Sequence, residues 1–140
     1  MTRNEAREIQ MQILYEMDAD GEMSPERARS LAGDRLAGNH IERGGNLLAE
    51  IIEHLAEIDG RINACSTRWK TSRMPRVDLA IMRLASGEMR FADDIPDAVS
   101  INEAINMAKK FGTPHSAKFI HGVLGTVAKI KEGGRLPEHE

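Results

Sequence analysis

Apolar residues recur along this chain with the spacing of helices that bury one face. The first stripe consists of Ala6, Ile9, Ile13, Leu14 and Met17. Similar stripes run through residues 40–65, 77–89, 101–111 and 119–130. The sequence contains no alternating run of β-branched residues bounded by a hairpin turn. The pattern therefore predicts an all-α domain of about six or seven helices.

Capping residues indicate where the first helices begin and end. Thr2 and Glu5 have the spacing of a capping box, in which each side chain bonds the backbone N–H of the other residue. Gly21 ends the helix that follows. Ser24–Pro25 combines a serine cap with proline at the first helical position, so it predicts the start of a second helix.

The stripe over residues 40–65 predicts one long helix. Gly44–Gly45 could delay its start, and Gly60 is the place where it could kink. The stretch 66–76 has polar, turn-like chemistry, and Pro75 within it opens the next helix.

The C-terminal half contains two further helices after the loop at 91–97. Ser100 and Glu103 form a second predicted capping box, and we therefore assign Glu103 a mainly structural role. Gly112 stops the helix that this box opens, and Thr113–Pro114 starts the last one.

Length and composition predict one domain. A chain of 140 residues can bury a core without disulfides, and we expect the helical domain at 1–132 and a polar tail at 133–140. The chain has a single cysteine, Cys65, and therefore cannot form an intramolecular disulfide. The sequence has neither a signal-peptide core nor an apolar run of about 20 residues, so we expect a cytoplasmic protein without a membrane span.

Sequence motifs for catalysis are missing. The sequence has no glycine-rich phosphate loop, no paired metal motif and no nucleophile elbow. The five histidines are scattered, which favours structural or solvated roles for them. We therefore expect no enzyme, no catalytic residue, no cofactor and no metal.

Charge is unevenly distributed along a chain whose formal net charge is −3. Residues 61–90 contain seven basic and two acidic side chains, and residues 109–131 contain five lysines and no acid. Two basic segments in an acidic protein suit a phosphate-binding face. Charge alone leaves the alternative of an ordinary solvated surface equally open.

Two glycines interrupt the last predicted helix. Gly122 and Gly125 each cost about 1 kcal/mol relative to alanine in a helix interior. Glycine in such a place allows the close approach of another helix or of a ligand. We favour close helix packing for at least one of them.

Four stretches together resemble the NusB family of bacterial transcription antitermination factors. They are REIQMQILYEMD (7–18), VDLAIMRLASGEM (77–89), IPDAVSINEAINMAKKFG (95–112) and SAKFIHGVLGTVAK (116–129). The resemblance implies two packed helical bundles and binding to the boxA RNA element of ribosomal RNA transcripts. It also implies a partner, the small-subunit ribosomal protein that acts as NusE, within an antitermination complex of RNA polymerase.

The resemblance, carried over position by position, implies RNA contacts on the first and last helices. The positions are Arg3, Arg7, Tyr15, Lys118, Phe119 and His121. Lys109 and Lys110 end the neighbouring helix and are further candidates for phosphate contacts. Phe119 is a candidate for stacking on a base, with core packing as the competing interpretation.

One further position concerns the protein partner, and one stretch is an alternative RNA surface. Asp78 falls where the family often places an acid that faces the ribosomal protein, so we expect it on an exposed edge. If the RNA face lies elsewhere, the basic stretch from Arg68 to Arg76 is the next candidate.

Two alternative functions remain open at this stage. The chain could be a helical protein-interaction module with weak RNA affinity, because it has few N-terminal arginines and His121 where many members have asparagine. It could also be an accessory module related to those of ribosomal RNA methyltransferases, which predicts a downstream catalytic domain. The sequence leaves open whether the chain is a monomer or a homodimer.

Overall fold

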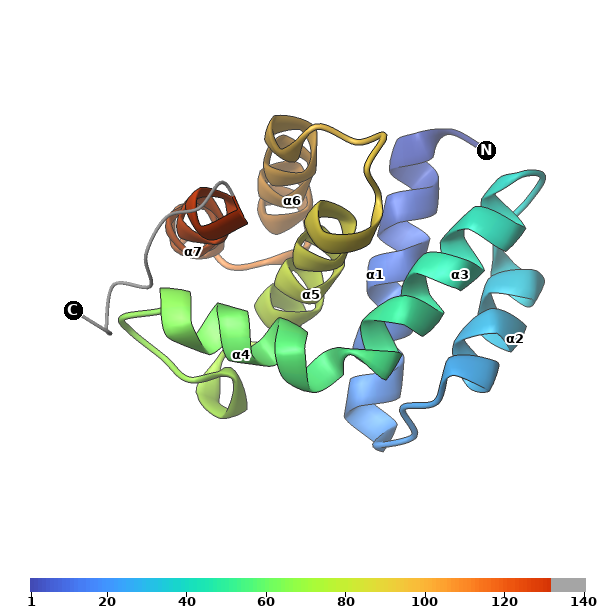
Figure 1. Ribbon diagram of the computed structural model, residues 1–140, viewed down its shortest axis with the longest axis horizontal. Coiled ribbons are helices and arrows are strands. Elements are labelled where there is room, and N and C mark those ends of the chain that lie inside the picture. The colour runs from blue at the N-terminus through green and yellow to red at the C-terminus, as the bar shows by residue number, and fades with distance from the viewer. Residues whose placement is uncertain (132–140) are drawn as a thin grey trace.

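The computed structural model describes residues 1–131, and helices make up most of them (Figure 1). The elements are α1 (Arg3–Asp20), α2 (Pro25–Arg35), α3 (His40–Glu53), α4 (Leu55–Cys65), the short 3₁₀ helix η1 (Thr71–Arg73), α5 (Arg76–Phe91), α6 (Asp97–Phe111) and α7 (Ser116–Lys131). No strand occurs within residues 1–131, so the predicted all-α class is confirmed. The tail expected at 133–140 lies outside the described residues.

Helix α5 is the centre of the fold. It packs against α1, α3, α4, α6 and α7, and every residue from 78 to 89 is buried. Helices α1, α2 and α3 lie on one side of it, and α4, α6 and α7 lie on the other (Figure 1). The arrangement is two packed bundles that share α5.

Helices α5 and α3 approach each other most closely at Gly87. A Cβ built on Gly87 would overlap the side chain of Ile51, which is fully buried. Glycine is required here because Ile51 occupies the space that a side chain would need.

We expect Gly87→Ala to lower the free energy of unfolding by about 1–3 kcal/mol, because overpacking outweighs the better helix propensity of alanine. Gly60→Ala is the matched control: Gly60 lies inside α4 with nothing within 4 Å of a built Cβ, so alanine should stabilise by up to about 1 kcal/mol. Urea denaturation of both variants measures the difference. Equal effects would contradict the assigned contact.

The predicted long helix at 40–65 is divided at His54, and the expected kink at Gly60 is wrong. His54 leaves the helical conformation with φ −111° and ψ 27°. Its Nδ1 lies 3.0 Å from the carbonyl oxygen of Glu50, and its ring packs on Phe91 at 5.1 Å between centroids. These contacts hold the break between α3 and α4.

The two predicted capping boxes have different outcomes. The box of Thr2 and Glu5 is confirmed, with hydrogen bonds of 2.7 and 3.1 Å. The box of Ser100 and Glu103 is wrong, because α6 begins one turn earlier, after Pro96. Ser100 lies inside α6, where it is buried and its Oγ donates to Glu88 at 2.7 Å.

Candidate nucleic-acid interface

Basic side chains between residues 1 and 131 divide into those paired with a carboxylate and those that are not. The paired ones are Arg7, Arg27, Arg35, Arg43, Arg61, Arg76, Arg83, Arg90, Lys110 and Lys131. The others, which have no ion pair within the described part of the chain, are Arg3, Arg29, Arg68, Lys70, Arg73, Lys109, Lys118 and Lys129. An unpaired cation keeps its charge available for a phosphate.

Arg7 is largely buried and exposes only a small part of its surface, at the edge of two cavities. Its Nε donates to Glu88 at 2.9 Å, and the two side chains are only 9% and 4% exposed. Glu88 also accepts the hydrogen bond from Ser100, so this network joins α1, α5 and α6. The burial and pairing of Arg7 give it a structural role, because the buried carboxylate of Glu88 needs this counter-charge. The RNA contact expected at Arg7 stays a prediction.

Asp78 is also buried, with 2% of its surface exposed, so the exposed edge expected for it is wrong. The Oγ of Ser116 donates to Asp78 at 2.7 Å and accepts from the backbone N–H of Thr113 at 2.9 Å. Burial raises the pKa of the Asp78 carboxyl above its ordinary value, and the bond from Ser116 opposes this. Asp78 thus holds the first turn of α7 and the α6–α7 turn in place.

The α6–α7 turn brings several of the predicted residues together. Lys109 and Lys110 end α6, and Lys118 and Phe119 lie in the first turn of α7, which contains no acidic residue. Lys110 donates to Glu8 of α1 at 2.9 Å, whereas Lys109 and Lys118 are exposed and unpaired within the described residues. Positive charge therefore gathers on both sides of the turn.

Helix α1 contributes Tyr15 and Arg3 at separate places. Tyr15 is 41% exposed, and it follows Glu8 by two helical turns, so both side chains lie on the same face of α1. Arg3 is exposed and lies five positions before Glu8, about 140° around the helix axis from it at 3.6 residues per turn. The α6–α7 turn can therefore share a surface with Tyr15 more readily than with Arg3.

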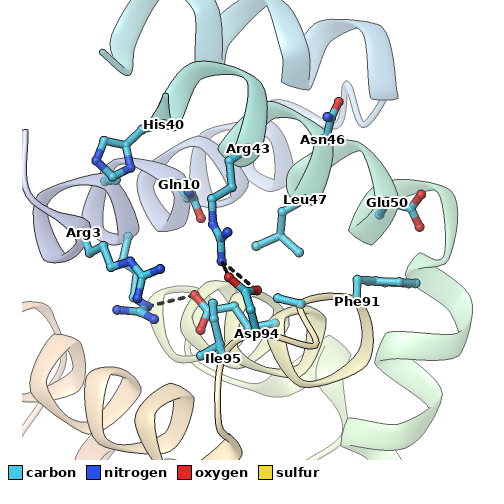
Figure 2. A pocket seen from close by; sticks show the side chains of 14 residues that line it. Arg3, Gln10, His40, Arg43, Asn46, Leu47, Glu50, Phe91, Asp94 and Ile95 are labelled. Carbon is cyan, nitrogen blue, oxygen red and sulfur yellow. Dashed lines mark hydrogen bonds and ion pairs between the residues drawn. The ribbon is translucent and has the colours of Figure 1, made fainter. Parts of the chain in front are cut away.

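Arg3 lies at a cavity of about 420 Å³ between α1, α3 and the end of α5. Figure 2 shows the charged side chains around it, including Arg43, which is paired with Asp94 at 2.8 Å across the opening. Basic and acidic side chains both line this cavity. Within residues 1–131 no group of three or more His, Cys, Asp or Glu side chains could hold a metal ion.

Phe119 is half-buried and packs edge-on against Trp69, with 5.1 Å between ring centroids. The guanidinium of Arg68 lies 4.5 Å from the centre of the Trp69 ring. Sequence reasoning singled out the basic stretch that contains Trp69 but missed the tryptophan itself. The sequence signal that could have identified Trp69 is an aromatic residue between two cations, Arg68 and Lys70.

His121, Gly122 and Gly125 lie on the outer side of α7. His121 and Gly122 are exposed, and a Cβ built on either glycine would meet nothing within 4 Å. The predicted helix packing at these glycines is therefore wrong for both. At Gly122 and Gly125, between Lys118 and Lys129, no side chain covers the backbone of α7.

Comparisons with known proteins agree with this architecture. The family model of the NusB family matches residues 4–129. The transcription antitermination protein NusB of Desulforamulus reducens is 40% identical over an alignment of 134 residues, and the match covers 94% of this chain and 93% of that protein. NusB of Agathobacter rectalis is 42% identical over 131 residues, covering 91% of this chain and 100% of the relative.

Solved structures agree as well. The crystal structure of T. maritima NusB matches with a TM-score of 0.84 at 28% identity and covers 99% of this chain and 95% of its own. No helix within residues 1–131 combines the length and apolar character that a membrane span needs.

Proposed function

Because this chain belongs to the NusB family of transcription antitermination proteins, we propose that it binds boxA-type single-stranded RNA of ribosomal RNA transcripts. In this proposal the small-subunit ribosomal protein that acts as NusE binds alongside, and the pair joins the antitermination complex of RNA polymerase. The family is non-catalytic, and this chain is not an enzyme.

The observation that carries the proposal lies at the α6–α7 turn, where two lysines without an ion pair in the described residues accompany an aromatic ring. Lys109 and Lys118 have no carboxylate partner within residues 1–131, and Phe119 follows Lys118 directly. Single-stranded RNA binds through backbone contacts with cations and through stacking of bases on aromatic rings. Tyr15 and His121 are the further contacts that we propose, and Arg3 is a peripheral one.

Lys110 has a different expected contribution. Its Nζ lies 2.9 and 3.1 Å from the two carboxylate oxygens of Glu8. A phosphate must therefore compete with Glu8 for this ammonium group, which makes Lys110 a weaker phosphate contact than Lys109.

Salt dependence of RNA affinity tests these assignments. For single strands, log K changes with log salt by about −0.7 for each phosphate contacted. We expect Lys109→Ala and Lys118→Ala each to make the slope shallower by about 0.7, and Lys110→Ala to change it less. Fluorescence anisotropy of a labelled boxA-type RNA at several salt concentrations measures the slopes.

The control is Arg29→Ala, an exposed and unpaired cation of α2, at the far end of the molecule from α7 (Figure 1). It should leave the slope unchanged. Parental slopes in both Lys109→Ala and Lys118→Ala would rule out the α6–α7 turn as the RNA surface.

A second candidate function is a protein-interaction module with weak RNA affinity. The burial of Arg7 and the pairing of Lys110 with Glu8 favour it, because both remove cations from the predicted RNA surface. Binding to the ribosomal protein without any binding to boxA-type RNA, in the presence or absence of that protein, would select this candidate.

A further inference from the structure

The connector between α4 and α5, residues 66–75, is the feature that the function above leaves unused. We infer that it forms a second RNA-contacting surface, continuous with the α6–α7 turn through Trp69 and Phe119. A base of the single strand stacks at Trp69 and Arg68, while Lys70 and Arg73 contact phosphates. This inference rests on the proposed RNA binding, and it extends the path of the bound RNA strand across α7.

Uncompensated positive charge is the first observation. Arg68, Lys70 and Arg73 are exposed and have no ion pair within the described part of the chain. The acids of the adjoining elements are already engaged, since Asp18 binds Arg76 and Asp59 binds Arg83. The connector therefore presents three cations that no carboxylate neutralises, as a polyanion requires.

The connector is held in a fixed conformation. The Oγ of Ser66 donates to the carbonyl of Trp69 at 2.6 Å and accepts from its backbone N–H at 3.2 Å. The backbone N–H of Thr71 donates to Asn63 at 2.7 Å, and Met74 is buried with 2% exposure. A fixed backbone lowers the entropy cost of ordering the cations on binding.

The aromatic contact joins the connector to α7. Trp69 is half-buried against Phe119, and the Arg68 guanidinium covers part of its ring at 4.5 Å. Indole rings and planar guanidinium groups both stack on nucleobases. Lys118 directly precedes Phe119, and Arg68 and Lys70 flank Trp69, so cations of the connector and of the α6–α7 turn adjoin the same aromatic pair.

Helix α7 leaves room beside this pair. Gly122 is one helical turn after Phe119, and a Cβ there would meet nothing within 4 Å. No side chain at that position blocks the helix surface next to the Phe119 ring. A strand that crosses from Lys118 to Arg68 thus meets bare helix backbone at Gly122.

Salt titrations with the full chain test the charges. The probes are a boxA-type single-stranded RNA and an unrelated single strand of the same length. We expect Arg68→Ala, Lys70→Ala and Arg73→Ala each to make the slope of log K against log salt shallower by about 0.7, with Arg29→Ala as the control. Arg68→Lys should keep the slope but lower the affinity several-fold, since lysine has the charge without the planar stack.

Trp69 reports on the stacking directly, because it is the only tryptophan of the chain. Its fluorescence should change on RNA binding and saturate together with the anisotropy of the labelled RNA. Urea denaturation of each variant checks that its fold is intact.

The outcomes separate the two claims. If Lys109→Ala and Lys118→Ala change the slope while the connector variants and the Trp69 emission do not, the inference is overturned and the proposed function stands. If the connector variants lose only the ribosomal protein, the connector is a protein surface and the inference is again overturned. If the chain binds neither RNA, both claims fail.

Discussion

Replacing Arg7 by alanine should destabilise the domain by about 3–5 kcal/mol, the effect expected when one partner of a buried ion pair is removed. The variant would leave the carboxylate of Glu88, 4% exposed, without its counter-charge. Ser100 alone would remain as a hydrogen-bond donor to that carboxylate. Urea denaturation followed by circular dichroism measures the loss.

Two further variants separate this structural role from an RNA contact. Arg7→Met combined with Glu88→Gln removes both charges and should recover much of the lost stability, because no charge remains buried alone. Arg3→Ala, an exposed and unpaired position of the same helix within the described residues, should leave stability nearly unchanged. If Arg7→Ala keeps parental stability and only makes the salt slope of RNA binding shallower, Arg7 is an RNA contact after all.

Local sequence signals predicted the helices well where the helix ends depend on local chemistry. The Thr2–Glu5 box and the Ser24–Pro25 start depend on backbone groups within one turn, and both are present. Ser100 and Glu103 have the spacing of the first box but not its function. Glu88, twelve positions earlier, accepts the hydrogen bond of the Ser100 hydroxyl, and no local sequence pattern contains that contact.

The glycines show the same limit of local sequence patterns, which do not contain contacts between distant segments. The sequence offers Gly44–Gly45 as residues that could delay the start of the helix at 40–65 and Gly60 as a place for a kink. In the structure α3 runs through Gly44 and Gly45, and α4 runs through Gly60. A Cβ on Gly44 would lie 2.5 Å from Leu36 and 2.7 Å from Gln10. This glycine serves the packing of α3 on its neighbours, which the sequence alone does not reveal.

The sequence predicts which residues could bind RNA, but it does not predict whether each of them is exposed, buried or paired with an acid. The sequence identifies the basic segments, and it cannot say which cations find a carboxylate on a distant helix. Lys109 and Lys110 are neighbours in the chain, and only Lys110 reaches an acid, Glu8, from a position 102 residues away. The Trp69–Phe119 contact likewise joins two segments whose sequences carry no sign of each other.

Because Asp78 is buried and not on an exposed edge, a charge reversal there should act on folding first. Asp78→Arg should lower the free energy of unfolding by more than about 3 kcal/mol, since it places an unpaired cation at a site with 2% exposure. It also removes the acceptor of Ser116, and with it the anchor of the turn that carries Lys118. Affinity for RNA and affinity for the ribosomal protein should therefore fall together.

Asp78→Asn is the matched control, because its side-chain oxygen can still accept from Ser116 at the observed 2.7 Å. This variant should keep the fold, and both binding affinities should stay near the parental values. Urea denaturation, RNA anisotropy and pull-down of the ribosomal protein give the three readouts. A folded Asp78→Arg variant with parental stability that loses only the ribosomal protein would instead place the carboxylate at the partner interface. The hydrogen bond to Ser116 argues against that result, because a carboxylate that fixes the start of α7 from beneath cannot also face a partner across the surface.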